Sequence, residues 1–460
     1  MIQFPNDFIW GSATSSYQIE GAYNKDGKGP SIWDAFCKIP GKVANMDTGD
    51  LACDHYHKMK EDVAMMKSLG LKAYRFSIAW PRILPDGTSQ NINQKGIQFY
   101  SDLIDELLAN DIEPWVTLYH WDLPLALQFE VDGWLGPKIP DLFAEYAELC
   151  FEHFGDRVKN WITINEAWVI AILGYGQGVF APGRISNSEP YLAGHHILLA
   201  HAKAVDVYRK KFQTTQKGKI GITNNCDWRE PLTDSIEDKA AAQRAVEFFL
   251  AWFADPIYFG KYPDVMIERL GDRLPQFTEE EIKLVKGSSD FFGLNHYTTS
   301  YASEAGQNLE KGTIYGNGGL SEDQDVNLKV DPKWEKTSMK WSIVPWGCQK
   351  LLEWIADRYD NPILYITENG CAFNDRIENG EVNDQARLDF VKGYLEACHQ
   401  AIQNGVNLKG YFLWSLMDNF EWASGYEKRF GMTYVDFKTL ERTPKKSAYW
   451  YRDVIKENGF

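Results

Sequence analysis

Residues 161–166 read Trp-Ile-Thr-Ile-Asn-Glu, and residues 363–368 read Ile-Leu-Tyr-Ile-Thr-Glu. Each is a short apolar run, rich in β-branched and aromatic side chains, that ends in polar groups. This pattern is typical of a strand buried in a parallel sheet. Similar runs occur at residues 8–11, 73–78, 115–119, 219–223, 290–295 and 410–415. The sequence therefore predicts eight buried strands.

Amphipathic segments separate these runs. Residues 61–70, 99–108 and 142–154 carry apolar side chains three and four positions apart, as in a helix that packs on one face. Alternating strands and helices indicate a parallel sheet, and eight such units predict a closed (β/α)8 TIM barrel of the α/β class. An open doubly wound sheet is the alternative, but no Gly-x-Gly-x-x-Gly motif follows an early strand.

The chain reads as one domain over residues 1–460, because no fixed-period repeat and no Pro- or Ser-rich linker divides it. The longest stretch expected to be irregular is residues 303–340, which has many charges and few apolar anchors. Such long loops inside a compact domain are usually functional or mobile. Because this one follows the sixth run, we expect it at the active face of the barrel, where it would shape the leaving-group side together with the segment after Gly370.

Charge and cysteine content limit the partners and the compartment. The formal net charge of −16 argues against a protein that mainly grips nucleic acid or an anionic membrane, and no apolar run is long enough to span a bilayer. The seven cysteines are scattered and odd in number, so free thiols in a reducing compartment are expected. The first residues lack a basic segment and a long apolar core, so we predict a cytoplasmic protein without a signal peptide. Whether it is a monomer or a homo-oligomer stays open.

The polar ends of the predicted strands are the place to look for chemistry, because side chains there face the ligand in a barrel. Glu166 ends the fourth run and Glu368 ends the seventh. One such glutamate is more often solvated or salt-bridged than catalytic. Two carboxylates at one barrel mouth can act as acid and nucleophile if their surroundings separate their pKa values. Other strand ends supply Arg75, His120, Asn295, Tyr297 and Trp414, a set suited to a neutral polyhydroxylated ligand.

Six ordered motifs resemble glycoside hydrolase family 1. Residues 163–166 (Thr-Ile-Asn-Glu) look like its acid/base motif, and residues 366–370 (Ile-Thr-Glu-Asn-Gly) look like its nucleophile motif. The other four are residues 11–21, 74–77 (Tyr-Arg-Phe-Ser), 118–124 (Leu-Tyr-His-Trp-Asp-Leu-Pro) and 418–422 (Asp-Asn-Phe-Glu-Trp). The resemblance spans essentially the whole chain.

This resemblance implies double-displacement hydrolysis of a β-glycosidic bond. Glu368 would attack the anomeric carbon, and Glu166 would protonate the leaving oxygen and then act as base on water. In retaining enzymes the two carboxyl groups lie only ~5–5.5 Å apart. Arg75 and Tyr297 match the family positions that keep the nucleophile ionised, and Tyr297 also faces the substrate.

The resemblance also assigns residues that bind the sugar. Gln18 and Glu421 match residues that bind the outer hydroxyls of the glycone. His120 and Trp422 match donors to a ring hydroxyl. Trp414 would form the platform under the C–H face of the ring, although a tryptophan at any one of these positions could simply belong to the core.

Three more positions concern the 2-hydroxyl and the leaving group. Asn165 would contact the 2-hydroxyl, and Asn295 matches a residue close to that hydroxyl and the nucleophile. Trp341 matches a tryptophan on the leaving-group side. One departure is Ala167, which stands where the family usually has proline after the acid/base glutamate; its effect on the loop stays open.

The implied activity is an exo-acting β-glucosidase, with some tolerance of β-galactosides and β-fucosides, that acts on a small-molecule β-glycoside without a cofactor. Within the family, the runner-up is a 6-phospho-β-glycosidase. Those relatives have Ser in place of Glu421, although Lys428 and Arg429 follow here. Outside that activity, the protein could be a non-catalytic sugar-binding barrel or a metal-dependent sugar isomerase.

Histidines provide the only candidates for a metal site, in the sequence His55-x-His57 and in the cluster His195, His196 and His201. No carboxylate accompanies them at ligand spacing, so we predict that they are structural and that no metal is bound.

Overall fold

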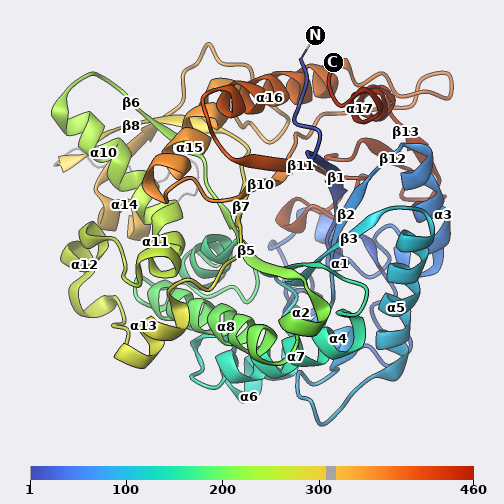
Figure 1. Cartoon of the computed structure of the whole chain (residues 1–460), viewed down its shortest axis with the longest axis horizontal. Coiled ribbons are helices and arrows are strands. Elements are labelled where there is room, and N and C mark those ends of the chain that lie inside the picture. The colour runs from blue at the N-terminus through green and yellow to red at the C-terminus, as the bar shows by residue number, and fades with distance from the viewer. Residues whose placement is uncertain (1, 307–317) are drawn as a thin grey trace.

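The computed structural model describes residues 2–306 and 318–460. Eight parallel strands close into a barrel at the centre of the molecule (Figure 1). Their order around the barrel is β1 (Ile9–Ala13), β11 (Leu408–Trp414), β10 (Leu364–Asn369), β7 (Phe292–Asn295), β5 (Lys219–Asn225), β4 (Asn160–Asn165), β3 (Glu113–Tyr119) and β2 (Ala73–Ser77). Each strand matches one of the predicted runs, so the predicted (β/α)8 TIM barrel is confirmed.

Helices surround the barrel and cover the outer face of its strands (Figure 1). The segments predicted to be helical lie within α3 (His55–Ser68), α5 (Gln94–Ala109) and α7 (Ile139–Phe154) or extend just past their ends. The other long helices are α8 (Glu189–Lys211), α15 (Pro345–Arg358), α16 (Gln385–Gln403) and α17 (Lys446–Glu457). Every residue of β2 and β4 is buried, which explains why neither strand alternates between an apolar and a solvent-exposed face.

Shorter elements fill the connections between strands. The α-helices among them are α1 (Ser16–Ile19), α2 (Ile32–Phe36), α4 (Trp80–Ile83), α6 (Leu125–Glu130), α9 (Gln213–Gln216), α10 (Ile236–Val246), α11 (Trp252–Phe259), α12 (Asp264–Leu270), α13 (Glu279–Val285) and α14 (Gly318–Gln324). The connections also contain two π-helices, η3 (Val169–Gly176) and η4 (Glu247–Ala251), and a two-stranded sheet of β12 (Thr433–Val435) and β13 (Arg442–Pro444).

Aromatic side chains pack the interior of the barrel. The ring of Trp115 lies 4.8 Å from that of Tyr365, 5.0 Å from that of Phe412 and 5.8 Å from that of Phe291, measured between centroids. All four are buried and belong to one cluster that also includes Trp414. The barrel is therefore a solid core below its carboxyl-terminal mouth.

The stretch predicted to be irregular, residues 303–340, is partly regular, and this expectation was wrong. It contains the end of β8 (Thr299–Glu304), α14 and β9 (Val326–Lys329), while residues 307–317 lie outside the described part. β8 pairs with β9 and with β6 (Trp228–Pro231) in a separate sheet. A small apolar cluster shared with α10 supports this sheet. Because this cluster buries only a few short side chains, the sequence shows no clear apolar pattern that would predict these strands.

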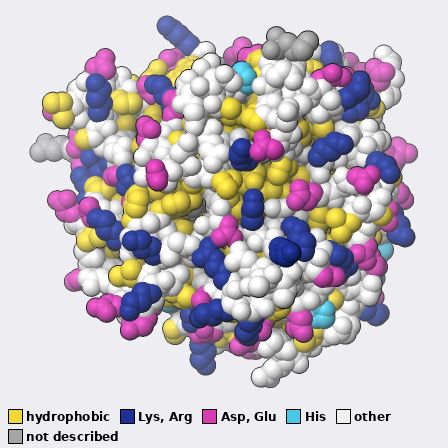
Figure 2. Space-filling view, viewed as in Figure 1, with side chains coloured by type: hydrophobic (Ala, Val, Ile, Leu, Met, Phe, Trp, Pro, Cys, Tyr) yellow, Lys and Arg dark blue, Asp and Glu magenta, His cyan; other side chains and the backbone are white. Residues whose placement is uncertain are grey.

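The two ends of the described chain lie side by side (Figure 1). The amide of Ile2 donates to the carbonyl of Phe460 at 2.6 Å, and the reverse bond measures 3.0 Å. Within residues 2–306 and 318–460, no helix has both the length and the apolar composition needed to cross a bilayer. Figure 2 shows Lys and Arg side chains interspersed with Asp and Glu over one face of the molecule.

Candidate active site

A cavity of about 450 Å³ lies at the carboxyl-terminal ends of the barrel strands. Nine residues predicted from the sequence line it: His120, Glu166, Asn295, Tyr297, Trp341, Glu368, Trp414, Glu421 and Trp422. The other three, Gln18, Arg75 and Asn165, are buried directly behind this lining and bind to it by hydrogen bonds. The fold thus gathers all the predicted residues at one place.

Glu368 in β10 is held by two donors. Arg75 in β2 donates to its Oε1 and is fully buried, and the Tyr297 hydroxyl donates to its Oε2 at 2.7 Å. Burial and the nearby charge of Glu368 raise the pKa of Tyr297 well above its ordinary value, so the phenol keeps its proton. Both carboxylate oxygens therefore accept hydrogen bonds, one of them from a cation, which suits an ionised nucleophile.

Glu166 has the opposite surroundings. It follows β4 with a φ of 53°, and its side chain is buried. Burial, followed by the charge of Glu368, raises its pKa well above that of an ordinary glutamate. The Asn295 side chain donates to its Oε1 at 2.6 Å. This carboxyl group is therefore poised to hold a proton at neutral pH, as a general acid must.

A continuous chain of hydrogen bonds connects the two glutamates. Arg75, which binds Glu368, also donates from Nη2 to Asn165 Oδ1 at 2.6 Å. Asn295 donates from Nδ2 to the same Asn165 oxygen at 3.1 Å and to Glu166 at 2.6 Å. Side chains from β2, β4, β7 and β10 thus fix the two carboxyl groups with respect to each other, although about two hundred residues separate them in sequence.

His120 places a neutral imidazole ring at the cavity wall. Asn165 donates from Nδ2 to its Nε2 at 3.2 Å. Burial and the charge of Arg75 lower its pKa well below that of an ordinary histidine. The ring is therefore neutral, and its proton is on Nδ1, which has no partner among the described residues.

Stacked rings flank His120. The Trp414 ring lies 5.8 Å from it at an interplanar angle of 18°, and the Trp422 ring lies 5.9 Å from it at 14°. Both tryptophans are almost fully buried, yet each contributes to the cavity surface. Flat apolar faces beside polar donors match a ligand that has hydroxyl groups at its edges and C–H bonds on its face.

Glu421 is held from behind by Gln18. The Gln18 amide donates to Glu421 Oε2 at 3.4 Å, to Asn419 Oδ1 at 2.9 Å and to the Phe420 carbonyl at 2.9 Å. Burial and the charge of Glu368 raise the pKa of Glu421 to about 8. Gln18 itself is not part of the cavity surface, so it positions the loop and Glu421 presents the polar group.

The structure adds a largely apolar wall to the cavity that the sequence did not predict. It consists of Val169 and Leu173 on η3, the following residues Gln177, Val179 and Phe180, and Asn225, Asp227, Met339, Ala423, Ser424 and Phe430. Trp341 belongs to the same side, with its ring 5.4 Å from Tyr297 and 6.0 Å from Phe430. Two segments were expected to shape the leaving-group side: residues 303–340 and the segment after Gly370. The described part of residues 303–340 contributes Met339 to the cavity lining. Residues 371–407 are all described, and none of them lines the cavity.

Most wall residues are apolar and adjoin the core, so nothing in their pattern separates them from core residues. The closest sequence signal is the position of Val169 and Leu173, three and seven residues after Glu166. Ala167, the departure from the family pattern, is fully buried behind this wall.

The histidines considered for a metal bind protein groups instead. His195 lies 2.9 Å from the Tyr262 hydroxyl, His196 lies 2.9 Å from the Trp134 carbonyl, and His201 lies 2.7 Å from the Thr163 hydroxyl. His55 pairs with Asp62 at 2.8 Å. In the described part of the chain, no group of three or more His, Cys, Asp or Glu side chains is arranged to hold a metal ion.

Comparisons with known proteins agree with this geometry. The model of glycosyl hydrolase family 1 matches residues 1–460. β-Glucosidase 4 from rice (Oryza sativa subsp. japonica) is 48% identical over 467 residues, which cover 98% of this chain and 95% of that protein.

Two solved structures are also similar. The β-glucosidase from Thermotoga maritima in complex with deoxynojirimycin has a TM-score of 0.93 and 46% identity, and the match covers 100% of both chains. A mutant of the rice Os3BGlu6 β-glucosidase, in a covalent complex with Glc from GA4GE, has a TM-score of 0.93 and 43% identity, covering 98% of this chain and 99% of that chain. The chain belongs to glycosyl hydrolase family 1 and is a glycoside hydrolase.

Proposed function

We propose that the protein is a retaining, exo-acting β-glucosidase in which Glu368 is the nucleophile and Glu166 is the acid/base. One observation carries the proposal. Two carboxyl groups of the same cavity are joined by one hydrogen-bond chain but have opposite surroundings: a cation and a phenol for Glu368, and burial with a single amide donor for Glu166. This asymmetry is what separate nucleophile and acid roles require.

The reaction follows from these roles. In the first step an oxygen of Glu368 bonds to the anomeric carbon, the bond to the leaving oxygen breaks, and Glu166 transfers its proton to that oxygen. In the second step Glu166 takes a proton from water, the water oxygen bonds to the anomeric carbon, and the bond to Glu368 breaks. Two inversions return the β configuration. Loss of the charge on Glu368 in the intermediate removes one cause of the high pKa of Glu166, so Glu166 can become a base.

The rice Os3BGlu6 β-glucosidase supports a covalent route, because a mutant of that protein forms a covalent complex with Glc. The glycone contacts proposed for this chain are His120 and the indole of Trp422 to a ring hydroxyl, Asn165 to the 2-hydroxyl, and Glu421 to the outer hydroxyls. Trp414 would lie under the ring, and Trp341 would line the leaving-group side. Tolerance of β-galactosides and β-fucosides would follow if Glu421 accepts either orientation at the 4-position.

Exo action is supported by the packing beneath the cavity. Trp115, Phe291, Tyr365 and Phe412 fill the barrel below it, so a glycan cannot thread through. The terminal sugar would be held between Glu421 and Glu368, while the leaving group would extend toward the apolar wall. Aryl and alkyl β-glucosides and cello-oligosaccharides are the substrate classes that such a cavity would accept.

A 6-phospho-β-glycosidase is the runner-up within the family. Glu368 already places a carboxylate in the cavity, and it would repel a phosphate dianion there. Lys428, the nearest candidate to bind a phosphate, donates to the Ser338 carbonyl at 3.0 Å. A preference for the plain glucoside is therefore expected.

We also propose that residues 1–460 form one catalytic domain and that the protein works in the cytoplasm. All seven cysteines are buried free thiols, which suits a reducing compartment.

The decisive experiment is an NMR time course on 4-nitrophenyl β-glucoside. We expect β-glucose to appear first and to mutarotate later; α-glucose as the initial product would refute the retaining mechanism.

Glu368→Ala should abolish turnover, and added azide should yield α-glucosyl azide, because the small anion occupies the space of the missing carboxylate. Full activity of Glu368→Ala without azide would exclude Glu368 as the nucleophile. Wild-type protein without any turnover would point to a sugar-binding barrel.

Two further comparisons test the phospho-glycosidase and the isomerase. The 6-phosphorylated nitrophenyl glucoside should react much more slowly than the plain one, and the reverse order would favour the phospho-glycosidase. Activity should persist in a chelator, whereas its loss would favour a metal-dependent isomerase.

A further inference from the structure

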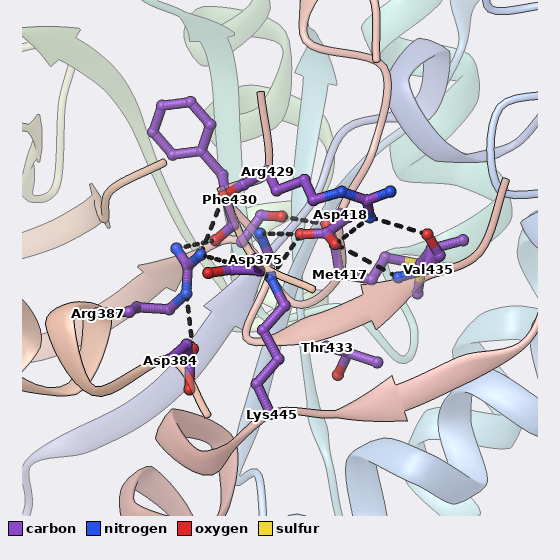
Figure 3. A network of polar contacts seen from close by, with 12 residues as sticks. Asp375, Asp384, Arg387, Met417, Asp418, Arg429, Phe430, Thr433, Val435 and Lys445 are labelled. Atoms are coloured by element: carbon purple, nitrogen blue, oxygen red, sulfur yellow. Dashed lines mark hydrogen bonds and ion pairs between the residues drawn. The ribbon is translucent and has the colours of Figure 1, made fainter. Parts of the chain in front are cut away.

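A cluster of buried charges lies near the cavity and takes no direct part in the proposed reaction. Its members, here called the ion cluster, are Asp375, Asp384, Asp418, Arg387, Arg429 and Lys445 (Figure 3). The side chains of all but Arg429 are at most 4% exposed, and Arg429 is 17% exposed. The three acids balance the three bases, and none of the six lines the cavity.

Asp418 joins three segments through its two carboxylate oxygens. Oδ1 accepts from Lys445 Nζ at 2.8 Å and from the Gly431 amide at 3.0 Å. Oδ2 accepts from Arg429 Nη1 at 2.6 Å (Figure 3). A Cβ atom at Gly431 would lie 2.0 Å from the Asp418 amide nitrogen, so the two backbones touch here and only glycine fits. Asp418 therefore fixes the start of the loop after β11 to the end of that loop.

Arg387 on α16 connects this loop to the nucleophile strand. Its guanidinium donates to the Phe430 carbonyl at 3.2 Å and to the Arg429 carbonyl at 3.0 Å, and it also donates to the Cys371 carbonyl. It is paired in addition with Asp375 and with Asp384, the latter at 2.9 Å. One side chain thus binds the backbone just after β10 and the backbone near the end of the next loop.

The segments that the ion cluster holds carry cavity residues. Cys371 lies three residues after Glu368, and Asp418 lies three residues before Glu421. Phe430, whose carbonyl Arg387 binds, itself lines the cavity. The barrel sheet does not reach Glu421, because β11 ends at Trp414 and Met417 forms an isolated bridge with Thr433. Gln18 holds Phe420 and Glu421 from one side, and the ion cluster ties both ends of the same loop to the segment after Glu368. The relative placement of Glu421 and Glu368 therefore depends on the ion cluster as well as on Gln18.

We propose that Asp418 and Arg387 are positioning residues that set the distance between Glu421 and Glu368, and so determine how strictly the enzyme requires a hydroxymethyl group on its sugar. This inference rests on the proposed function and deepens it. A buried ion cluster adds little net stability compared with apolar side chains of similar size, because desolvation offsets the attraction between charges. Its contribution here is geometric: it fixes a loop whose glutamate binds the outer hydroxyls.

The test compares two sugars that differ only at this group. Asp418→Asn keeps the shape of the side chain and removes the charge that pairs with Lys445 and Arg429. The measured quantity is the ratio of kcat/KM for 4-nitrophenyl β-glucoside to that for 4-nitrophenyl β-xyloside, which lacks the hydroxymethyl group. We expect this ratio to fall about tenfold, mainly through KM of the glucoside. A ratio within about twofold of the wild-type value would overturn the proposal.

A matched control separates positioning from loss of stability. Asp255 on α11 is also buried and pairs with Arg358 at 2.6 Å, but it lies outside the cavity. Asp255→Asn should lower the amount of folded protein without changing the ratio, because unfolding affects both substrates equally. An equal change of the ratio in Asp255→Asn would contradict the proposal.

A double-substitution cycle tests the route through Glu421. If Asp418 acts by placing Glu421, Asp418→Asn should lower the ratio little once Glu421→Gln is present. Additive losses would show that Asp418 acts by another route and would overturn the proposal.

A binding measurement that needs no hydrolysis tests this inference separately from the proposed function. Calorimetry should show that Asp418→Asn weakens binding of 1-deoxynojirimycin, which carries the hydroxymethyl group, by about tenfold more than binding of its xylose-shaped analogue. If Asp418→Asn does not fold, the same two ligands can be compared with Arg387→Lys. This substitution keeps the positive charge but removes the guanidinium group that donates to several backbone carbonyls. Equal weakening of both ligands would refute the inference, even in a protein with no hydrolytic activity.

Discussion

The hydroxyl of Tyr297 lies 2.7 Å from Oε2 of Glu368 and donates a hydrogen bond to it. Because burial and the charge of Glu368 hold the pKa of Tyr297 far above neutrality, this donor persists over the whole working pH range. The contact stabilises the carboxylate in the free enzyme and must weaken when that oxygen, or its partner, bonds to the sugar. Tyr297 is thus expected to act both in holding the nucleophile and in its release.

Replacing this tyrosine tests its role. Tyr297→Phe should lower kcat/KM by about 10- to 100-fold, because a hydrogen bond to a charged group contributes about 1.5–3 kcal/mol. Steady-state kinetics on an aryl β-glucoside measure the loss. Tyr359→Phe is the matched control, since Tyr359 also donates to a buried carboxylate, that of Asp255, at 2.8 Å but outside the cavity. A similar loss in both variants would argue against a specific role for Tyr297.

The acid role of Glu166 predicts a dependence on the leaving group. Glu166→Ala should lower kcat/KM for methyl β-glucoside by about 10²–10⁴-fold, because an alkoxide needs the proton. The loss should be much smaller for 2,4-dinitrophenyl β-glucoside, whose phenolate leaves unaided. Added azide should speed the second step with that substrate and give β-glucosyl azide. Equal losses for both substrates would count against the assignment, and Glu247→Ala, outside the cavity, controls for loss of a carboxylate.

The coupling between the two glutamates can be measured directly. In Glu368→Gln the negative charge near Glu166 is gone, so the pKa of Glu166 should fall. It should stay above that of an exposed glutamate because burial remains. Carbon-13 NMR titration of the labelled carboxyl groups reports this shift. Glu421→Gln, the same change in the same cavity, should shift Glu166 less, and an equal shift would place the coupling elsewhere.

Glu421 should make the stability of the protein depend on pH. Its pKa is raised to about 8 in the folded protein, so it binds a proton more tightly there than in the unfolded chain. The stabilisation that comes from this tighter proton binding is fully present below about pH 4.3, the pKa of a glutamate in the unfolded chain. It is lost as the pH rises through about 8, the pKa of Glu421 in the folded protein. Glu421→Gln should therefore gain stability relative to wild type between pH 5 and pH 8, by about 3–4 kcal/mol.

Thermal unfolding at both pH values measures this gain. Glu396→Gln, on the exposed side of α16, controls for the substitution itself. A Glu421→Gln benefit that is as large at pH 5 as at pH 8 would contradict the prediction.

The sequence was most informative where strands end. Glu166 and Glu368 could be assigned to one site because parallel strands bring their carboxyl ends together, and this depends only on strand count and order. The wall formed by Val169 and Leu173 escaped prediction because apolar side chains in a cavity and in a core obey the same pattern. A π-helix, which has no strong sequence pattern of its own, carries both of them.

The ion cluster was hidden for another reason. Asp418 and Lys445 are 27 residues apart, and Arg387 reaches segments 16 and 43 residues away. Single charged residues of this kind usually lie on the surface, so only the folded arrangement reveals that they are paired and buried. The same holds for β8 and β9, whose short pairing depends on a few small side chains.

The aromatic side chains below the cavity determine how molecules reach and leave it. Because Trp115 and its neighbours fill the barrel interior, substrate, water and products must all pass through the opening at the carboxyl-terminal end of the barrel. In the proposed reaction, the aglycone would leave first, water would then enter by the same opening, and the freed sugar would leave last. Glucose that stays bound would keep the next substrate out, so the closed lower end of the barrel predicts competitive inhibition by glucose.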